Sequence, residues 1–214
     1  MPKGWALPAE TERGRAVLAL VELWAENGYA GLSVTEIAAR AGMSRERFEG
    51  LFDSVEAAAV TANEAPLAAV VEIVADLYSA DRSEAESYAV AVVGILRLMT
   101  ANPAYCYLTF IGGRQMAPSR VHEVFESGHQ FLVAMLERLW AASPLSDQPA
   151  RVGVAALGAA EAVVRREIVA GRYEALPALA PDLVYGSMVP FLGQAEAMRL
   201  AELSRRHLEE DLEA

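Results

Sequence analysis

Residues 32–52 read LSVTEIAARAGMSRERFEGLF. Ser33-Val34-Thr35-Glu36 forms a capping box, in which a serine oxygen and a glutamate satisfy the amides that begin a helix. Gly42 suits the turn that ends this helix, and Ser44 can cap another that runs to about Phe52. Inward-facing apolar side chains recur on both helices, at Ile37, Ala41, Met43, Phe48 and Leu51. The pattern predicts a helix-turn-helix, although any corner between two helices satisfies part of it.

The rest of the chain has the same helical periodicity. Apolar positions recur at helical spacing, and alternating runs of β-branched residues, typical of half-buried strands, are absent from the 214 residues. We therefore expect an all-α fold, with Val17, Leu20, Val21 and Trp24 on the buried face of the first helix. The predicted helices span about residues 11–27, 33–41, 44–52, 54–79, 83–101, 103–111, 118–142, 149–171 and 181–207.

Composition and charge restrict the class of protein. With 54% hydrophobic residues the chain can form a core, and a net charge of −11 disfavours indiscriminate binding to nucleic acid or anionic membranes. Apolar runs fall short of the ~20 residues that cross a bilayer, and no secretion signal is evident. The single cysteine, Cys106, cannot form an internal disulfide. These features predict a cytoplasmic protein without a membrane segment.

No motif indicates an enzyme, a cofactor or a metal site. Phosphate-binding glycine-rich motifs, His-Glu-x-x-His and Gly-x-Ser-x-Gly are all absent. His122, Glu126 and His129 share one helix face, but a di-iron bundle needs a second Glu-x-x-His step, which the chain lacks. We expect these three side chains to line a polar pocket or a solvated face.

Four segments of the N-terminal region resemble one family of regulators. They are residues 26–29, 32–38, 41–44 and 48–52, and their sequences are similar to the N-terminal domain of tetracycline-repressor-like (TetR family) transcription regulators. The resemblance covers about residues 11–60, and residues 176–185 and 190–193 also resemble the C-terminal dimerisation region of some members. It implies a three-helix helix-turn-helix DNA-binding domain at residues 1–55 and a helical ligand-binding and dimerisation domain at residues 56–214.

The resemblance also implies how DNA is bound. Two recognition helices of a homodimer would enter successive major grooves of a pseudo-palindromic operator. On this chain the recognition helix begins at Ser44, and the residues expected to face the groove are Arg45, Glu46, Arg47 and Glu49. Arginine can bind guanine and glutamate can accept from cytosine, which favours a GC-containing half-site. Ser33 and Thr35, at the start of the preceding helix, are expected to contact phosphate.

Two positions depart from the family pattern. Glu49 stands where members usually have a tyrosine, and Val55 where they have a lysine, and both positions normally contact phosphate. Residues 1–55 carry six basic and eight acidic residues, a net charge of −2. Because non-specific affinity grows with the number of phosphates neutralised, we expect weak background binding and a shallow salt dependence. The alternative is that DNA binding has been lost.

A ligand cavity in the C-terminal domain is a further implication. Candidate lining residues are Tyr78, Tyr88, Met99, Tyr105, Phe110, His122, Phe125 and His129. Such apolar and aromatic side chains suit a small apolar ligand, with hydroxyl groups to orient it. The alternative interpretation is an ordinary core, because aromatic residues at helical spacing more often serve packing.

Two alanine-rich and valine-rich segments are expected to form the dimer interface. Residues 149–171 and 181–207 are apolar on more than one face, and small side chains let helices approach closely. Burial within one subunit is the alternative. The combined prediction is a ligand-responsive, homodimeric DNA-binding regulator, more often a repressor in this family. The second hypothesis is a helical dimer that binds a small molecule or a protein and has weakened or lost DNA binding.

Overall fold

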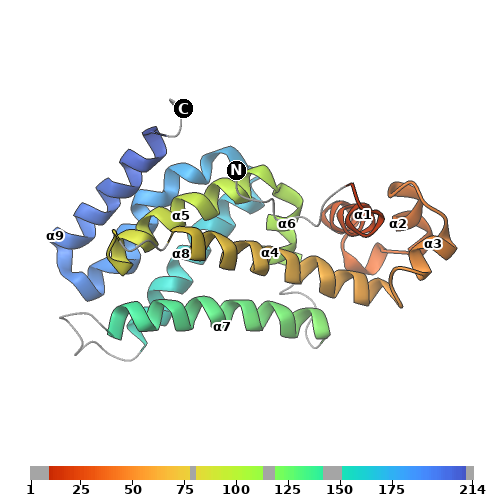
Figure 1. Cartoon of the computed structure of the whole chain (residues 1–214), viewed down its shortest axis with the longest axis horizontal. Coiled ribbons are helices and arrows are strands. Elements are labelled where there is room, and N and C mark those ends of the chain that lie inside the picture. The colour runs from red at the N-terminus through yellow and green to blue at the C-terminus, as the bar shows by residue number, and fades with distance from the viewer. Residues whose placement is uncertain (1–9, 78–80, 113–118, 142–150, 211–214) are drawn as a thin grey trace. The chain divides into compact units, whose positions relative to one another are not determined.

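All regular secondary structure in the described residues is helical. The computed structural model describes residues 10–77, 81–112, 119–141 and 151–210 (Figure 1). Its α-helices are α1 (Glu12–Asn27), α2 (Val34–Arg40), α3 (Arg45–Glu49), α4 (Val55–Leu77), α5 (Glu84–Ala101), α6 (Pro103–Tyr107), α7 (Arg120–Ala141), α8 (Val152–Val169) and α9 (Ala180–Glu210). The expected all-α fold is confirmed.

The chain forms two compact units. The first comprises residues 1–69 and 101–128, and the second comprises residues 70–100 and 129–214. The first unit therefore contains α1, α2 and α3 together with α6, which packs against α1. The functional division at residue 55 stays a prediction.

The first unit is built around α1. Val17, Leu20, Val21 and Trp24 are buried on α1, as the apolar spacing predicts. A Cβ added to Gly112, which follows α6, would lie 3.0 Å from Nε1 of Trp24, so the chain passes directly over this indole ring. The buried face of α1 thus packs against α6 and the turn that follows it.

The second unit has its own core around Trp140. The indole ring of Trp140 stacks on Phe191, with ring centroids 4.5 Å apart and planes inclined by 16°. Tyr88 lies in the same cluster and donates its hydroxyl hydrogen to Oγ of Ser187 at 2.9 Å. Residues from α5, α7 and α9 therefore share one core.

Three expected helices differ in detail. The helix predicted at 181–207 is interrupted at Gly193, whose φ of 75° and ψ of 170° are non-helical, shortly after Pro190 removes a backbone donor. The helix predicted at 103–111 ends at Tyr107 and continues as a π-helical turn over Leu108–Gly112. The recognition helix is also shorter than expected, since α3 ends at Glu49.

Within the described ranges, one helical segment is long and apolar enough to cross a membrane, and Glu84–Ala101 with Pro103–Gly112 meets the same criterion only as a pair bent by 110°. The first of these is Tyr173–Glu210. Core helices of soluble proteins meet the same criterion, and Val184, Met188 and Leu200 of this segment are fully buried in the second unit. Packing within that unit accordingly accounts for these three apolar residues.

Glu86, at the start of α5, is expected to make a pH-dependent contribution to stability. The backbone N–H of Ser83, the guanidinium of Arg199 and the Ser83 hydroxyl all donate to Glu86 and lower its pKa from 4.5 to about 2. A carboxylate with a depressed pKa in the folded state stabilises the fold above its unfolded pKa, and this contribution is lost as the pH falls towards 2.

We therefore expect the free energy of unfolding to fall between about pH 4.5 and 2, and to fall less steeply in Glu86→Gln. Urea unfolding across this range measures the effect. Glu137→Gln, which removes an exposed carboxylate from α7 of the same unit, should retain the wild-type slope. Equal slopes for wild type and Glu86→Gln would contradict the assignment.

Candidate nucleic-acid interface

The beginning of α2 is fixed by Ser33. Its Oγ accepts the N–H of Glu36 at 3.2 Å and donates to Oε2 of Glu36 at 2.6 Å. The predicted cap is therefore present, with the glutamate bound to the serine hydroxyl. Ile37 and Ala38 on the opposite face are buried, so α2 packs against α1 in one orientation.

The turn between α2 and α3 orients the second helix. Gly42 has a φ of 68°, and the N–H of Met43 donates to the carbonyl of Ala38 at 3.0 Å. Ser44 caps α3 by accepting the N–H of Arg47 at 3.2 Å. Phe48, the buried residue of α3, is fully enclosed. Because Phe48 faces inward, the remaining side chains of this short helix face solvent.

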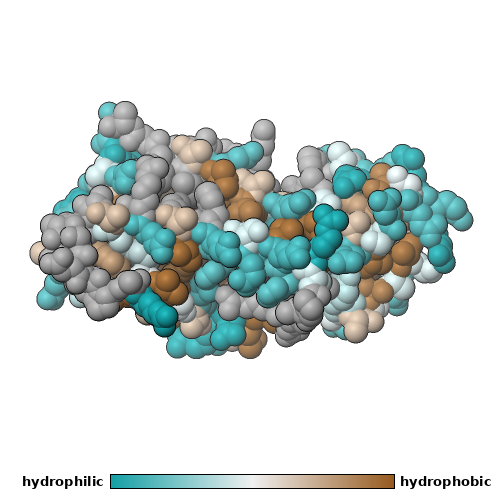
Figure 2. All heavy atoms as spheres, turned by 90° about the horizontal axis from the view of Figure 1, so that it is seen from below, coloured by the Kyte–Doolittle hydropathy of each residue, from teal (hydrophilic) through white to brown (hydrophobic). Residues whose placement is uncertain are grey.

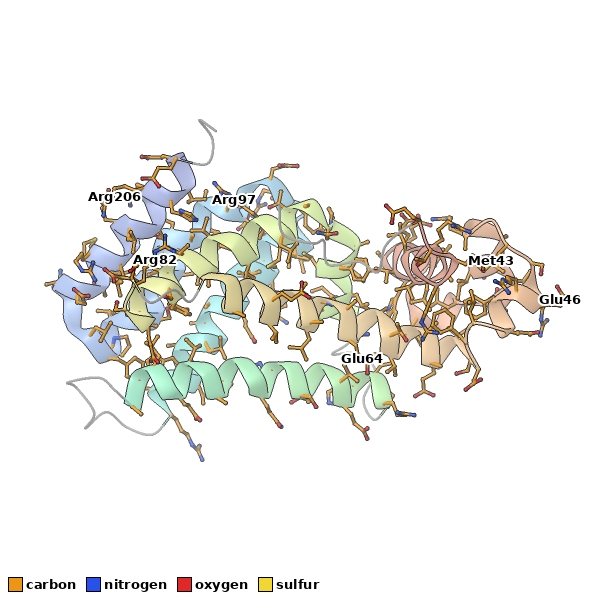
Figure 3. All side chains as sticks on the ribbon, in the orientation of Figure 1. Met43, Glu46, Glu64, Arg82, Arg97 and Arg206 are labelled. Carbon is orange, nitrogen blue, oxygen red and sulfur yellow. The ribbon has the colours of Figure 1, made fainter. Side chains whose placement is uncertain are left out.

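The structure exposes the predicted DNA-binding residues of the recognition helix. Ser44, Arg45, Glu46, Arg47 and Glu49 are all exposed. Glu46 projects outward from α3 (Figure 3), and the visible surface at the α3 end is mostly hydrophilic (Figure 2). At the start of α2, by contrast, Thr35 is exposed and Ser33 is half-buried, with its hydroxyl bound to Glu36.

Both arginines of α3 are held by carboxylates. Nε of Arg45 lies 2.7 Å from Oε1 of Glu49, one helical turn further on. Nε of Arg47 lies 2.9 Å from Oε2 of Glu12 on α1, and its Nη2 contacts the same oxygen. These hydrogen bonds from Arg47 lower the pKa of Glu12. The guanidinium groups are thus ion-paired while still facing solvent.

Glu12 is a residue that sequence reasoning missed. It stands 35 positions before Arg47, and neither residue carries a local signal of the other. The relevant clue would have been that Glu12 begins the helix that packs against α2, but the pairing depends on how the three helices cross.

Two further arginines hold the helices together. Arg13 lies over the ring of Phe52, 4.3 Å from its centroid, and donates to the carbonyl of Leu51 at 2.9 Å. Arg40 donates from two nitrogens to the carboxylate of Glu26, at 3.0 and 2.9 Å. Arg13 and Arg40 therefore serve contacts within the first unit, whereas Arg45 and Arg47 lie on the recognition helix itself.

Glu46 keeps its negative charge at the start of α3. Its own backbone N–H and the hydroxyl of Ser44 donate to the carboxylate and lower its pKa. An ionised carboxylate can accept hydrogen bonds, as contact with the amino group of cytosine requires.

The predicted ligand residues are divided between the two units. Tyr105, Phe110 and His122 belong to the first unit, and Tyr88, Met99 and His129 belong to the second. Tyr78 lies outside the described residues, as does the side chain of Phe125.

Several of these side chains are core residues. Tyr88 and Met99 are buried in the second unit, and Nδ1 of His129 lies 2.9 Å from Oε1 of Glu161 on α8. The Tyr105 hydroxyl is buried and has no hydrogen-bond partner among the described residues. Burial also raises the pKa of Tyr105 to about 12, so this hydroxyl stays protonated and able to donate.

The other candidate reactive groups are placed as follows. Cys106 is buried, and burial raises the pKa of its thiol. His122 lies 3.9 Å from Glu126, whereas His129 contacts Glu161 on another helix. Among the described residues, no three His, Cys, Asp or Glu side chains are arranged as metal ligands.

Comparison with known proteins identifies the helix-turn-helix region. Residues 17–54 match the family described as bacterial regulatory proteins, tetR family. No curated protein sequence matches the chain significantly.

Several solved structures have a similar fold. The fatty acid degradation regulator FadR from Bacillus halodurans has a TM-score of 0.72 at 15% identity, with 84% of this chain and 94% of that chain covered. FadR from Bacillus subtilis, solved in complex with stearoyl-CoA, has a TM-score of 0.67 at 16% identity, covering 84% and 97%. A gamma-butyrolactone receptor (ArpA-like protein) has a TM-score of 0.66 at 19% identity, covering 95% and 100%. At these identities the likeness concerns the fold.

Proposed function

We propose that this chain, a TetR-family transcription regulator by its N-terminal domain and its fold, is a cytoplasmic repressor that a small apolar ligand releases from DNA. One observation carries the proposal. The recognition helix α3 presents Arg45, Glu46, Arg47 and Glu49 to solvent from a rigidly capped helix-turn-helix. Ser33, Thr35 and Ser44 are assigned to the same DNA surface.

The side chains of α3 favour a particular kind of operator. An arginine can fork to O6 and N7 of guanine, and a glutamate can accept from N4 of cytosine. A half-site that contains G·C pairs would therefore use both residue types. The net charge of −2 over residues 1–55 leaves little general attraction to phosphate, so specific base contacts must supply much of the affinity.

A homodimer is proposed because one recognition helix contacts only one half-site of a pseudo-palindromic operator. Ala155, Ala159 and Ala162 are exposed on α8 at spacings of four and three residues, which places them on one face. Val154 and Val169 on α8 and Met198 on α9 are also exposed, with 46%, 71% and 53% of their surfaces accessible. Small and apolar exposed residues on these helices support pairing of α8 and α9 with a second copy.

Ala159→Glu is expected to weaken this dimer by about 100-fold or more, because burying an unpaired charge costs several kcal/mol. Analytical ultracentrifugation across a range of protein concentrations measures the dissociation constant. Ala134→Glu, which adds the same charge to an exposed position of α7, should leave it unchanged. A dimer unaffected by Ala159→Glu would place the interface elsewhere.

An apolar ligand is proposed from Tyr105 and from the solved structures of similar fold. One of those proteins binds stearoyl-CoA and another is a gamma-butyrolactone receptor. Tyr105 supports a ligand site because its buried hydroxyl lacks a partner among the described residues, and buried polar groups are usually hydrogen-bonded. The other candidate ligand residues are Tyr78, Tyr88, Met99, Phe110, His122, Phe125 and His129.

Selection of bound duplexes from a random library, at low and at near-physiological salt, tests the proposed function. Recovery of one pseudo-palindrome at both salts is the expected result, and adding a long-chain acyl-CoA or a gamma-butyrolactone should then release the DNA. No enrichment from a folded dimer would favour the second candidate, a helical dimer with weakened DNA binding. The ion pairs that occupy Arg45 and Arg47 are the observation behind that candidate.

Arg45→Ala and Arg47→Ala are each expected to cost about 1–3 kcal/mol of specific binding per half-site and to relax the preference at particular base pairs. Fluorescence anisotropy with the selected operator and its single-base variants measures both effects. Arg82→Ala removes the same charge from an exposed position just before α5 (Figure 3) and should preserve the preference. An unaltered profile in both α3 variants would remove these residues as readers.

A further inference from the structure

We propose that Glu12 is an intramolecular competitor of DNA for Arg47, and that it limits the binding of this protein to non-cognate duplex. The inference rests on the proposed DNA-binding function and adds a residue of α1 to the groups that control it. Glu12 does not read DNA in this proposal; it acts through the guanidinium that it holds.

The carboxylate of Glu12 occupies one edge of the Arg47 guanidinium. Oε2 of Glu12 accepts from both Nε and Nη2 of Arg47, which are the nitrogens on the side of the fork that faces α1. This edge is one of the two by which an arginine can make bidentate contact with a phosphate. A backbone phosphate therefore cannot take both of these donors while Glu12 retains them.

The pair is positioned to exchange. The side chain of Arg47 is 59% exposed and that of Glu12 is 40% exposed, so neither is locked in a core. Exposed ion pairs are weak, and breaking one shifts an equilibrium by only about 1.5- to 5-fold. A better partner can therefore displace Glu12 from Arg47. Breaking the ion pair still reduces the binding free energy that Arg47 gains from a sequence-independent contact with phosphate.

The surrounding charge makes this competition matter. Residues 49–81 contain no lysine or arginine, and Arg13 and Arg40 are committed to contacts within the first unit. Arg45 and Arg47 are thus the cationic side chains of α3 itself, and Arg15 is the other arginine near Glu12. When Glu12 pairs with Arg47, the domain has one cation fewer to pair with DNA phosphates. The number of phosphates paired in this way sets the non-specific affinity.

Arg45 shows the same arrangement within α3, but its partner has a second role. Glu49 pairs with Arg45 and is also a candidate to contact the groove. Removing Glu49 would therefore change two interactions at once. Glu12 lies outside the groove-facing set, which makes it the cleaner residue for a test.

The experiment compares Glu12→Gln with Glu56→Gln on a duplex of random sequence. Both variants remove one negative charge from the first unit, and Glu56 is an exposed residue of α4 whose loss leaves the Arg47 pair intact. Fluorescence anisotropy across a series of salt concentrations gives the affinity and its salt slope. We expect Glu12→Gln to bind about 2- to 5-fold more tightly per subunit than Glu56→Gln, with a slope steeper by about 0.9 per additional phosphate.

Two further variants separate competition from a general structural effect. Arg47→Ala combined with Glu12→Gln should abolish the gain, because the released guanidinium is then absent. Glu12→Asp, which restores a carboxylate, should return the affinity towards wild type. Circular dichroism checks that α1 is retained in each variant.

Three results would overturn the inference. They are equal affinities and slopes for Glu12→Gln and Glu56→Gln, weaker binding by Glu12→Gln than by wild type, and no duplex binding by Glu12→Gln even at low salt. Failure of the proposed function is a separate result, because the wild-type protein would then select no sequence from the random duplex library. Non-specific binding that rises in Glu12→Gln would support the competition even in that case.

Discussion

Replacing Phe48 with alanine is expected to lower the free energy of unfolding of the first unit by about 3–5 kcal/mol, the usual cost of removing a buried aromatic ring. Phe48 is fully buried, and its ring packs against Phe52 with centroids 5.5 Å apart. The helix that carries it has five residues, too few to persist without tertiary contacts. Loss of this ring should therefore release α3 from the unit.

Amide hydrogen exchange of residues 45–49, together with urea unfolding followed by far-ultraviolet circular dichroism, measures both consequences. Phe48→Leu retains most of the apolar volume and should lose much less stability. Glu46→Ala changes an exposed residue of the same helix and serves as the control for altered helix propensity. A loss below about 1 kcal/mol in Phe48→Ala would mean that α3 is held by other contacts.

The same residue shows why local sequence signals predicted this region well. A cap at Ser44, a positive φ at Gly42 and an apolar side chain at Phe48 are each determined by neighbours within a few positions. The capping box at Ser83 and Glu86 was predictable for the same reason. Such features need no knowledge of how distant helices cross.

Contacts between distant segments were not predictable in this way. The pairing of Glu12 with Arg47 depends on the angle between α1 and α3, and sequence reasoning treated Arg47 only as a DNA contact. The break of α9 was missed because Pro190 and Gly193 occur inside a continuous apolar pattern, where periodicity predicts an uninterrupted helix. The assignment of ligand residues stays a prediction, since apolar side chains serve a core and a cavity equally well.

Gly153 illustrates the same limit, because its role comes entirely from a residue on another helix. An ideal Cβ at this position would lie 1.9, 2.3 and 2.7 Å from three atoms of the Trp140 ring. These distances are far below van der Waals contact. Trp140 is also stacked on Phe191, so its ring cannot move without disturbing the core of the second unit.

Gly153→Ala is therefore expected to destabilise the second unit by at least about 1–3 kcal/mol, the usual cost of overpacking a core. The sign of the change in unfolding free energy separates a clash from helix propensity, because alanine inside a helix is normally favoured over glycine by about 0.5–1 kcal/mol. Urea unfolding followed by far-ultraviolet circular dichroism gives the comparison with wild type and can be repeated in variants without this tryptophan.

The decisive comparison places Gly153→Ala in a Trp140→Leu background. Leucine lacks the three ring atoms that the added methyl group would strike, so the clash is removed and the helix preference of alanine should prevail. The same substitution should then become neutral or stabilising. If it remains equally destabilising without the indole ring, the close approach between Gly153 and Trp140 is not what selects glycine here, and the backbone of α8 itself must require it.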